Sequence, residues 1–117
     1  MKQYTPQEIV DTVIPLMVAQ GCPSVDEHGL CTYRGLNGTK CAAGFFLTDE
    51  EAECCSPVFS HPAFEGQAEE TLAVLKGIQS EAHDANSRRE ADFVPLFLSS
   101  MKGICSYHNL KFPEEYK

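Results

Sequence analysis

The fourteen residues Cys31–Gly44 constrain the fold of this chain more than any other stretch, because they combine a turn signal with a helix start. A tight two-residue turn needs positive φ at both central positions, and the pair Asn37-Gly38 adopts that conformation readily. The segment therefore predicts a β-hairpin with short strands at about 31–34 and 39–41. The apolar residues that follow predict a short helix at about 42–47.

The N-terminal segment predicts a well-capped helix. Thr5 and Glu8 have the spacing of a capping box, and Pro6 suits the first helical position. Apolar residues then recur at helical spacing until Gly21, which is typical of a helix end. Pro15 lies inside this segment, so we expect a kink or a local break there.

Helical patterns also dominate the second half of the chain. A second capping-box signal at 48–51 predicts another short helix, and the proline-containing stretch 54–66 predicts an irregular connection. A longer helix is expected at about 67–83. The last helix has two candidate caps, Ser87 and Asp92, the second of which would place a proline in the first turn.

These patterns predict one α+β domain that spans residues 1–117 and is mostly helical, with the short β-hairpin packed on helices. An isolated hairpin is marginal in water, so helices are expected to cover one of its faces. The sequence has neither an apolar run of the roughly 20 residues that a membrane span needs nor the pattern of a signal peptide. We therefore expect a cytoplasmic location.

The chain is acidic, with 17 acidic and 9 basic residues and a net charge of −8. Such a chain is repelled by nucleic-acid phosphates and by anionic lipid surfaces, so we expect no direct nucleic-acid binding and no membrane partner. Small acidic proteins can instead occupy basic surfaces on other proteins. Ordinary solubility is the alternative explanation of the charge.

The six cysteines show no C-x-x-C pair, so the sequence predicts no zinc site, no other metal centre and no cofactor. Without a secretory signal they are expected to be free thiols that mostly act as small apolar core residues. Cys54-Cys55 and His61 form the one local group of metal-ligand types, and their spacing is not that of a known site.

The core of the hairpin resembles a family of small proteins encoded by tailed bacteriophages and prophages, whose recurring phrase is Y-R-G-x-x-G-x-K-C-A-x-G followed by an apolar pair and D-E. The phrase appears here at 33–44 and Asp49-Glu50. The resemblance implies a phage or prophage origin and a small α+β fold, with no established activity. Family members often carry His-Asp directly after L-x-x-I, whereas in this chain His83-Asp84 comes four residues after that pattern.

A site for an anion is one hypothesis for this segment. Arg34 and Lys40 flank a glycine-containing turn that leads to a helix start, where unpaired backbone N–H groups favour negative charge. The expected ligand-binding residues are Tyr33, Arg34, Gly35, Gly38 and Lys40. Alternatively, the two cations pair with neighbouring acids such as Asp49 or Glu50 on a solvated surface.

A cysteine nucleophile is the second hypothesis. Cys41 at a helix start, next to a lysine, has a mechanism for a lowered pKa. A catalytic thiolate also needs a base, and His83 followed by Asp84 is the best candidate in the sequence. The alternative is that Cys41 is a small residue packed beneath the hairpin and that His83 lies on the surface.

Together these features favour a non-enzymatic phage accessory protein that binds a host component, in the cytoplasm of the host cell, and interferes with host metabolism or defence. The component would be a protein surface or a small anionic ligand such as a nucleotide. The alternative is a cysteine-dependent hydrolase or transferase that uses Cys41 and His83. The oligomeric state is left open, a homo-oligomer included.

Overall fold

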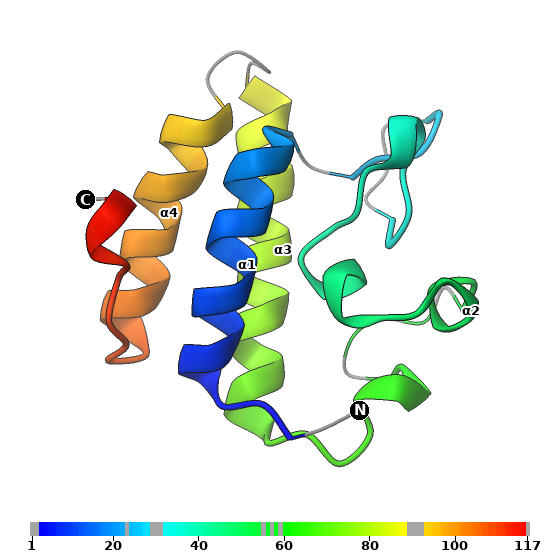
Figure 1. Cartoon of the computed structure of the whole chain (residues 1–117), viewed down its shortest axis with the longest axis horizontal. Helices are drawn as coiled ribbons and strands as arrows, with labels where there is room; N and C mark the ends of the chain where they lie inside the picture. Colours follow the sequence, from blue (N-terminus) through cyan, green and yellow to red (C-terminus); the bar gives the residue numbers. More distant parts are fainter. Residues whose placement is uncertain are drawn as a thin grey trace.

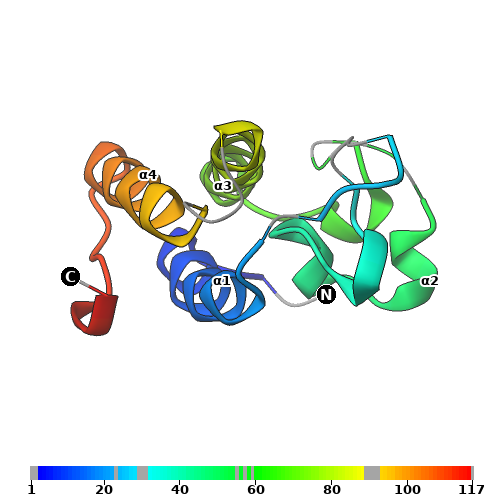
Figure 2. The same ribbon diagram turned by 90° about the horizontal axis from the view of Figure 1, so that it is seen from above.

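The computed structural model describes residues 3–22, 24–28, 32–54, 56, 58, 60–88 and 93–116, and their side chains except those of 82–88. Three long helices, α1 (Pro6–Gln20), α3 (Glu69–Arg88) and α4 (Phe93–Tyr107), pack against one another as a bundle. The described residues between 22 and 68 form a loop lobe on one side of it (Figures 1 and 2). No helix in the described part of the chain is both long and apolar enough to cross a lipid bilayer.

Helix α1 begins and ends as its sequence predicts. The Thr5 side chain accepts a hydrogen bond from the Glu8 N–H, and the Glu8 carboxylate accepts one from the Thr5 N–H, so the capping box is complete. Gly21 ends the helix in the left-handed region with φ 77° and donates its N–H to Met17. The helix continues through Pro15, so of the two alternatives expected there, a kink or a local break, the break is wrong.

The end of α3 and the start of α4 show which of the two predicted caps could begin α4. Ser87 lies inside α3, so it cannot begin α4. Helix α4 begins directly after Asp92, the other predicted cap, which itself lies outside the described residues. At the other end of α4, Asn109 adopts a φ of 58° and the Leu110 N–H donates to the Cys105 carbonyl at 2.7 Å, which closes the helix with a Schellman-type turn.

The core of the molecule lies between the three long helices. Full burial of a large apolar side chain contributes about 1.5–3 kcal/mol before the cost of ordering it. Thr71 is the one polar residue among the largest fully buried side chains, and its hydroxyl donates to the Tyr4 carbonyl at 2.8 Å. The largest fully buried apolar side chains are those of Ile9, Ile14, Met17, Leu75, Ile78, Phe93, Phe97 and Met101.

The predicted α+β class is wrong for the described residues, which are mostly helical and form no strand. Of the two predicted strands, 31–34 and 39–41, a single antiparallel bridge between Arg34 and Lys40 is present. Cys31, the first residue of the predicted hairpin, lies outside the described part.

The predicted turn nevertheless forms, as the 3-10 element η1 (Leu36–Gly38). Asn37 and Gly38 have φ values of 60° and 75°, and the Thr39 N–H donates across the turn to the Leu36 carbonyl. The Leu36 N–H is not available for pairing across the turn, because it donates to the Val25 carbonyl at 3.0 Å. The chain therefore doubles back without forming a ladder.

Short elements complete the loop lobe and the C-terminus. The helix expected at 42–47 is a single 3-10 turn, η2 (Ala43–Phe46), whereas the second capping box does begin a short helix, α2 (Asp49–Ala52). The described residues of the stretch 54–66 are irregular, as predicted, apart from η3 (Pro62–Phe64). The last described element is η5 (Glu114–Tyr116).

Candidate functional site

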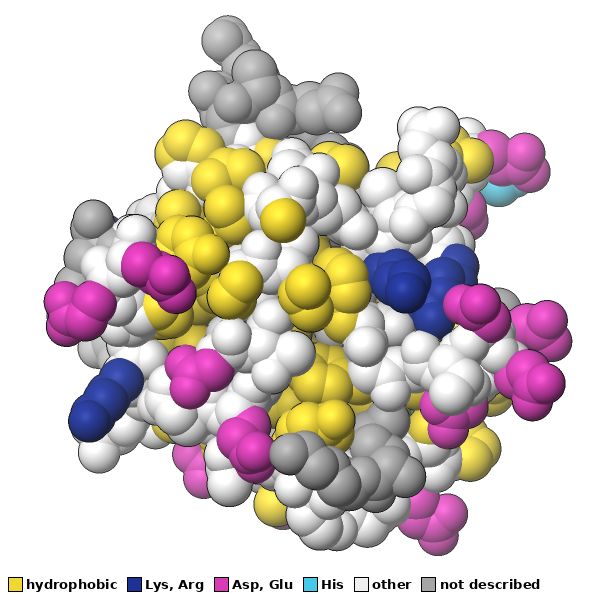
Figure 3. All heavy atoms as spheres, viewed as in Figure 1, with side chains coloured by type: hydrophobic (Ala, Val, Ile, Leu, Met, Phe, Trp, Pro, Cys, Tyr) yellow, Lys and Arg dark blue, Asp and Glu magenta, His cyan; other side chains and the backbone are white. Residues whose placement is uncertain are grey.

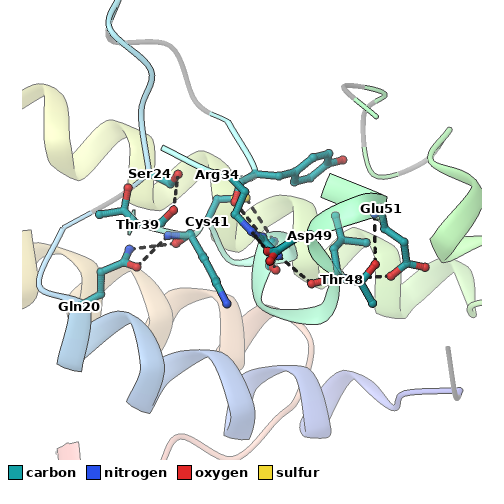
Figure 4. Close-up of polar contacts among 12 residues, drawn as sticks. Gln20, Ser24, Arg34, Thr39, Cys41, Thr48, Asp49 and Glu51 are labelled. Atoms are coloured by element: carbon teal, nitrogen blue, oxygen red, sulfur yellow. Dashed lines mark hydrogen bonds and ion pairs between the residues drawn. The ribbon is translucent and has the colours of Figure 1, made fainter. Parts of the chain in front are cut away.

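Arg34 is the centre of the predicted anion site, and its guanidinium group faces the loop lobe itself (Figure 4). Its Nη1 donates to the carbonyls of Gly44 at 2.8 Å and Tyr33 at 3.2 Å. Its Nη2 donates to the Leu47 carbonyl at 2.8 Å, and its Nε pairs with the Asp49 carboxylate at 3.1 Å. Four hydrogen bonds to the chain thus engage this side chain.

The carbonyl contacts of Arg34 matter more for stability than its ion pair does. Asp49 is 93% exposed, and pairs with such an exposed partner contribute about 0–1 kcal/mol. The Gly44 carbonyl also accepts the Leu47 N–H at 3.2 Å, so Arg34 gives it a second donor. The Leu47 carbonyl follows the turn and is not paired within it, so a cation that binds it satisfies an end group of the turn. Arg34 is therefore an anchor for the end of η2, and the acid pairing that the sequence allowed accompanies this role.

Tyr33 and Gly35 also serve packing. Tyr33 is only 8% exposed, and its hydroxyl donates to the Ser56 carbonyl at 2.6 Å. A Cβ atom on Gly35 would lie 2.5 Å from Ser24 Oγ and 2.7 Å from the backbone nitrogen of Val25. The first residue is thus covered and the second is a point of close backbone approach.

Lys40 is held by its backbone. The side-chain amide of Gln20, the last residue of α1, accepts from the Lys40 N–H and donates to the Lys40 carbonyl, both at 2.9 Å (Figure 4). This amide pair gives Lys40 the hydrogen bonds that a neighbouring strand would otherwise supply. The Lys40 ammonium group makes no hydrogen bond or ion pair with any described residue.

Cys41 lies at the start of η2 and is 4% exposed. Its sulfur accepts hydrogen bonds from the Gly44 N–H at 3.4 Å and from the Gln79 side-chain amide at 3.1 Å. His83 and Asp84, the proposed base and its partner, lie in α3, but their side chains are outside the described part. The described groups around the Cys41 sulfur are therefore hydrogen-bond donors from the backbone and an amide.

The other thiols differ in acidity. The hydrogen bond between the Cys54 sulfur and the Ser56 hydroxyl, together with one to the Ser56 backbone, lowers the pKa of half-buried Cys54. Burial raises the pKa of Cys105 in α4, and the nearby negative charge of Asp11 adds to this effect. Within the described residues no three His, Cys, Asp or Glu side chains are arranged to hold a metal ion.

Two residues with structural roles were missed in the sequence. The buried imidazole of His61 accepts the Ala63 N–H at its Nδ1 and lies 2.8 Å from the Glu51 carbonyl through its Nε2, so it joins η3 to α2. Gln20 was assigned no role at all. A glutamine at a helix end has no pattern that predicts which distant backbone it binds, whereas a histidine before proline does indicate a cap.

The chain matches no protein-family model, no curated protein and no solved structure. Its function must therefore be argued from its own residues. The residues of the phrase at 33–44 bind one another, the end of α1 and other segments of the loop lobe such as Leu47 and Ser56, and this arrangement supports a role in building the loop lobe.

A second region of interest lies on the bundle. Residues 12–20 of α1 and 93–101 of α4 contain no charged side chain. Because α4 runs opposite to α1, these two segments lie at the same end of the bundle (Figure 1). Figure 3 shows hydrophobic side chains gathered there. We call the surface of these two segments the neutral face; its exposed or half-buried apolar residues are Pro15, Leu16, Val18, Ala19, Val94, Pro95, Leu96 and Leu98.

Proposed function

We propose that this protein is a non-enzymatic accessory protein that binds a protein of the host cell through the neutral face. The observation that carries the proposal is the combination of exposed apolar surface and absent charge on segments 12–20 of α1 and 93–101 of α4, in a chain whose net charge is −8. Leu16, for example, is 41% exposed. Contiguous exposed apolar surface on a small protein is typical of a protein–protein contact.

The geometry gives less support to the two other functions considered. An anion would have to compete with three backbone carbonyls and Asp49 for the Arg34 guanidinium group. A substrate would have to reach a Cys41 sulfur that is 4% exposed and already accepts two hydrogen bonds. A protein surface needs no such rearrangement, because the neutral face is already exposed.

The resemblance to small proteins of tailed phages supports a partner in the host cytoplasm, where such a protein would interfere with metabolism or defence. The net charge of −8 favours a partner that is itself basic, because opposite net charges speed association and suppress wrong pairings.

The test compares two single-charge variants of the full chain. Ala19→Glu places a carboxylate on the neutral face, and Ser80→Glu places one at an exposed position of α3 outside it. After cross-linking in a bacterial lysate, we expect a partner that the unmodified chain and Ser80→Glu bind equally and that Ala19→Glu binds at least about ten-fold more weakly. The proposal is contradicted if both variants bind the partner as tightly as the unmodified chain does. It is also contradicted if the unmodified chain captures no partner.

A further inference from the structure

A cleft adjoins the neutral face on the side of the C-terminal segment. It has a volume of about 690 Å³ and lies between Gln7 and Asp11 of α1 and residues 110–114. Residues 7, 11, 15 and 18 follow one another along the same stripe of the helix, because residues three and four apart share a face. The cleft and the neutral face are therefore consecutive parts of one surface along α1.

The wall of this cleft is held in place from both helices. The Gln7 side-chain amide donates to the Lys111 carbonyl at 2.9 Å and accepts the Lys111 N–H at 2.8 Å. The ammonium group of Lys102 in α4 lies 5.6 Å from the centre of the Phe112 ring. A partner would thus meet a site that exists before binding, which reduces the entropic cost of association.

The charge of the cleft indicates what it would accept. Asp11 and Glu114 face it from opposite walls, both are exposed, and Lys111 is the one cation among its lining residues. The Asp11 carboxylate accepts a hydrogen bond from Gln7 at 3.0 Å, which fixes its position and leaves further acceptor capacity. An arginine fork or a lysine ammonium group suits such carboxylates.

We infer that this cleft receives an arginine or lysine side chain of a basic amphipathic helix in the protein partner, while the apolar side chains of that helix cover the neutral face. The inference rests on the proposed function and adds the chemistry of the partner. Asp11 and Val18 are about 10 Å apart along α1, at 1.5 Å per residue, so the basic residue would lie about two turns from the apolar anchors. A second copy of this chain fits poorly, because two molecules of charge −8 repel each other.

Two synthetic helical peptides test the inference with the full chain. They share a stripe of leucines and differ in one residue, arginine or its uncharged analogue citrulline, two turns from the stripe. We expect the dissociation constant of the arginine peptide, measured by fluorescence anisotropy, to be about ten-fold lower than that of the citrulline peptide. Asp11→Asn should abolish this preference, whereas Glu50→Gln, which removes an exposed charge from α2, should preserve it.

The outcomes separate this inference from the proposed function. Equal binding of both peptides, lost in Ala19→Glu, would overturn the role of the cleft and keep the neutral face. A preference that Glu50→Gln weakens as much as Asp11→Asn would overturn it too, because general charge attraction would then explain the binding. The inference is also overturned if neither peptide binds, or if sedimentation shows self-association that Ala19→Glu abolishes.

Discussion

The three-helix bundle and the loop lobe are stabilised in different ways. The bundle contains most of the large buried apolar side chains, such as Phe97 and Met101. The loop lobe relies on side chains that bind the main chain of another segment: Arg34 at the end of η2, Gln20 at Lys40 and His61 at Glu51. The difference shows what a segment without regular structure needs in order to adopt one conformation.

The physical reason is the backbone. A helix pairs its own N–H and C=O groups except at its ends, so its side chains are available for apolar packing. The loop lobe has no ladder among its described residues, and its backbone groups must find other partners. Some of these partners are carbonyls of other loop segments, such as Val25 for the Leu36 N–H, and others are side chains such as Arg34 and Gln20, so individual residues are decisive there.

The largest expected effect comes from the bundle. Phe97→Ala removes a fully buried ring that stacks on Phe93 at a centroid distance of 5.4 Å, and it should lower the free energy of unfolding by about 3–5 kcal/mol. Urea denaturation measures this. Leu36→Ala, at a residue 52% exposed in the turn, is the control and should change stability by less than about 0.5 kcal/mol. Similar losses in the two variants would contradict the picture of an apolar bundle.

Arg34→Ala addresses the loop lobe and should cost about 2–3 kcal/mol, because it removes the side-chain donor of the Leu47 carbonyl and one of the two donors of the Gly44 carbonyl. Hydrogen exchange should accelerate at 41–47 while the helices stay protected. Asp49→Ala removes only the ion-pair partner and should cost less than about 1 kcal/mol. If Asp49→Ala is as harmful as Arg34→Ala, the carbonyl contacts are not what stabilises the lobe.

Gln20 and Gln7, near the two ends of α1, each bind the backbone N–H and C=O of one distant residue through the side-chain amide, and we call these pairs the glutamine clamps. They allow a comparison of smaller effects on stability. Gln20→Glu removes the donor to the half-buried Lys40 carbonyl and should cost about 1–2 kcal/mol. Gln7→Glu removes the same donor from the exposed clamp at Lys111 and should cost about 0.5 kcal/mol, since water replaces it easily. Thermal unfolding of both variants tests the order, and a larger loss at Gln7 would reverse our interpretation.

The smallest effect concerns pH and the capping box of α2. The Thr48 N–H donates to the Glu51 carboxylate at 2.9 Å and holds the pKa of Glu51 below its ordinary value of 4.5. A lowered carboxylate pKa means stability that is present above pH 4.5 and is lost as the pH falls through the pKa of the folded protein. In a carboxyl NMR titration, Thr48→Pro should raise the pKa of Glu51 toward its ordinary value, because proline lacks the N–H and fits the φ of −71° at this position. An unchanged titration would refute the role of this N–H.

Local signals explain how much the sequence could predict. The capping boxes at Thr5 and Thr48, the glycine end of α1 and the positive φ at Asn37 and Gly38 all depend on neighbours within a few residues, and all are present. The long helices followed from apolar periodicity, which reports on burial along one face.

The errors arose where a distant residue competes for the same backbone. The predicted hairpin is reduced to one bridge, between Arg34 and Lys40, and the Leu36 N–H next to the turn donates to the Val25 carbonyl instead of pairing across it. The prediction that Arg34 binds an anion failed to foresee its tertiary contacts in the same way. No residue near Arg34 in the sequence indicates that carbonyls at the end of η2 accept hydrogen bonds from it. Such contacts depend on tertiary structure and leave no periodic trace.

The tight backbone approach at Gly35 has a consequence for mutational history. A methyl group there would meet the nitrogen of Val25, and one on Gly44 would meet the carbonyl oxygen of Tyr33. Neither obstacle is a flexible side chain that could swing aside. Diverged relatives of this chain can therefore vary at the majority of surface positions. They should keep glycine at both sites, nine residues apart, for as long as they keep this lobe.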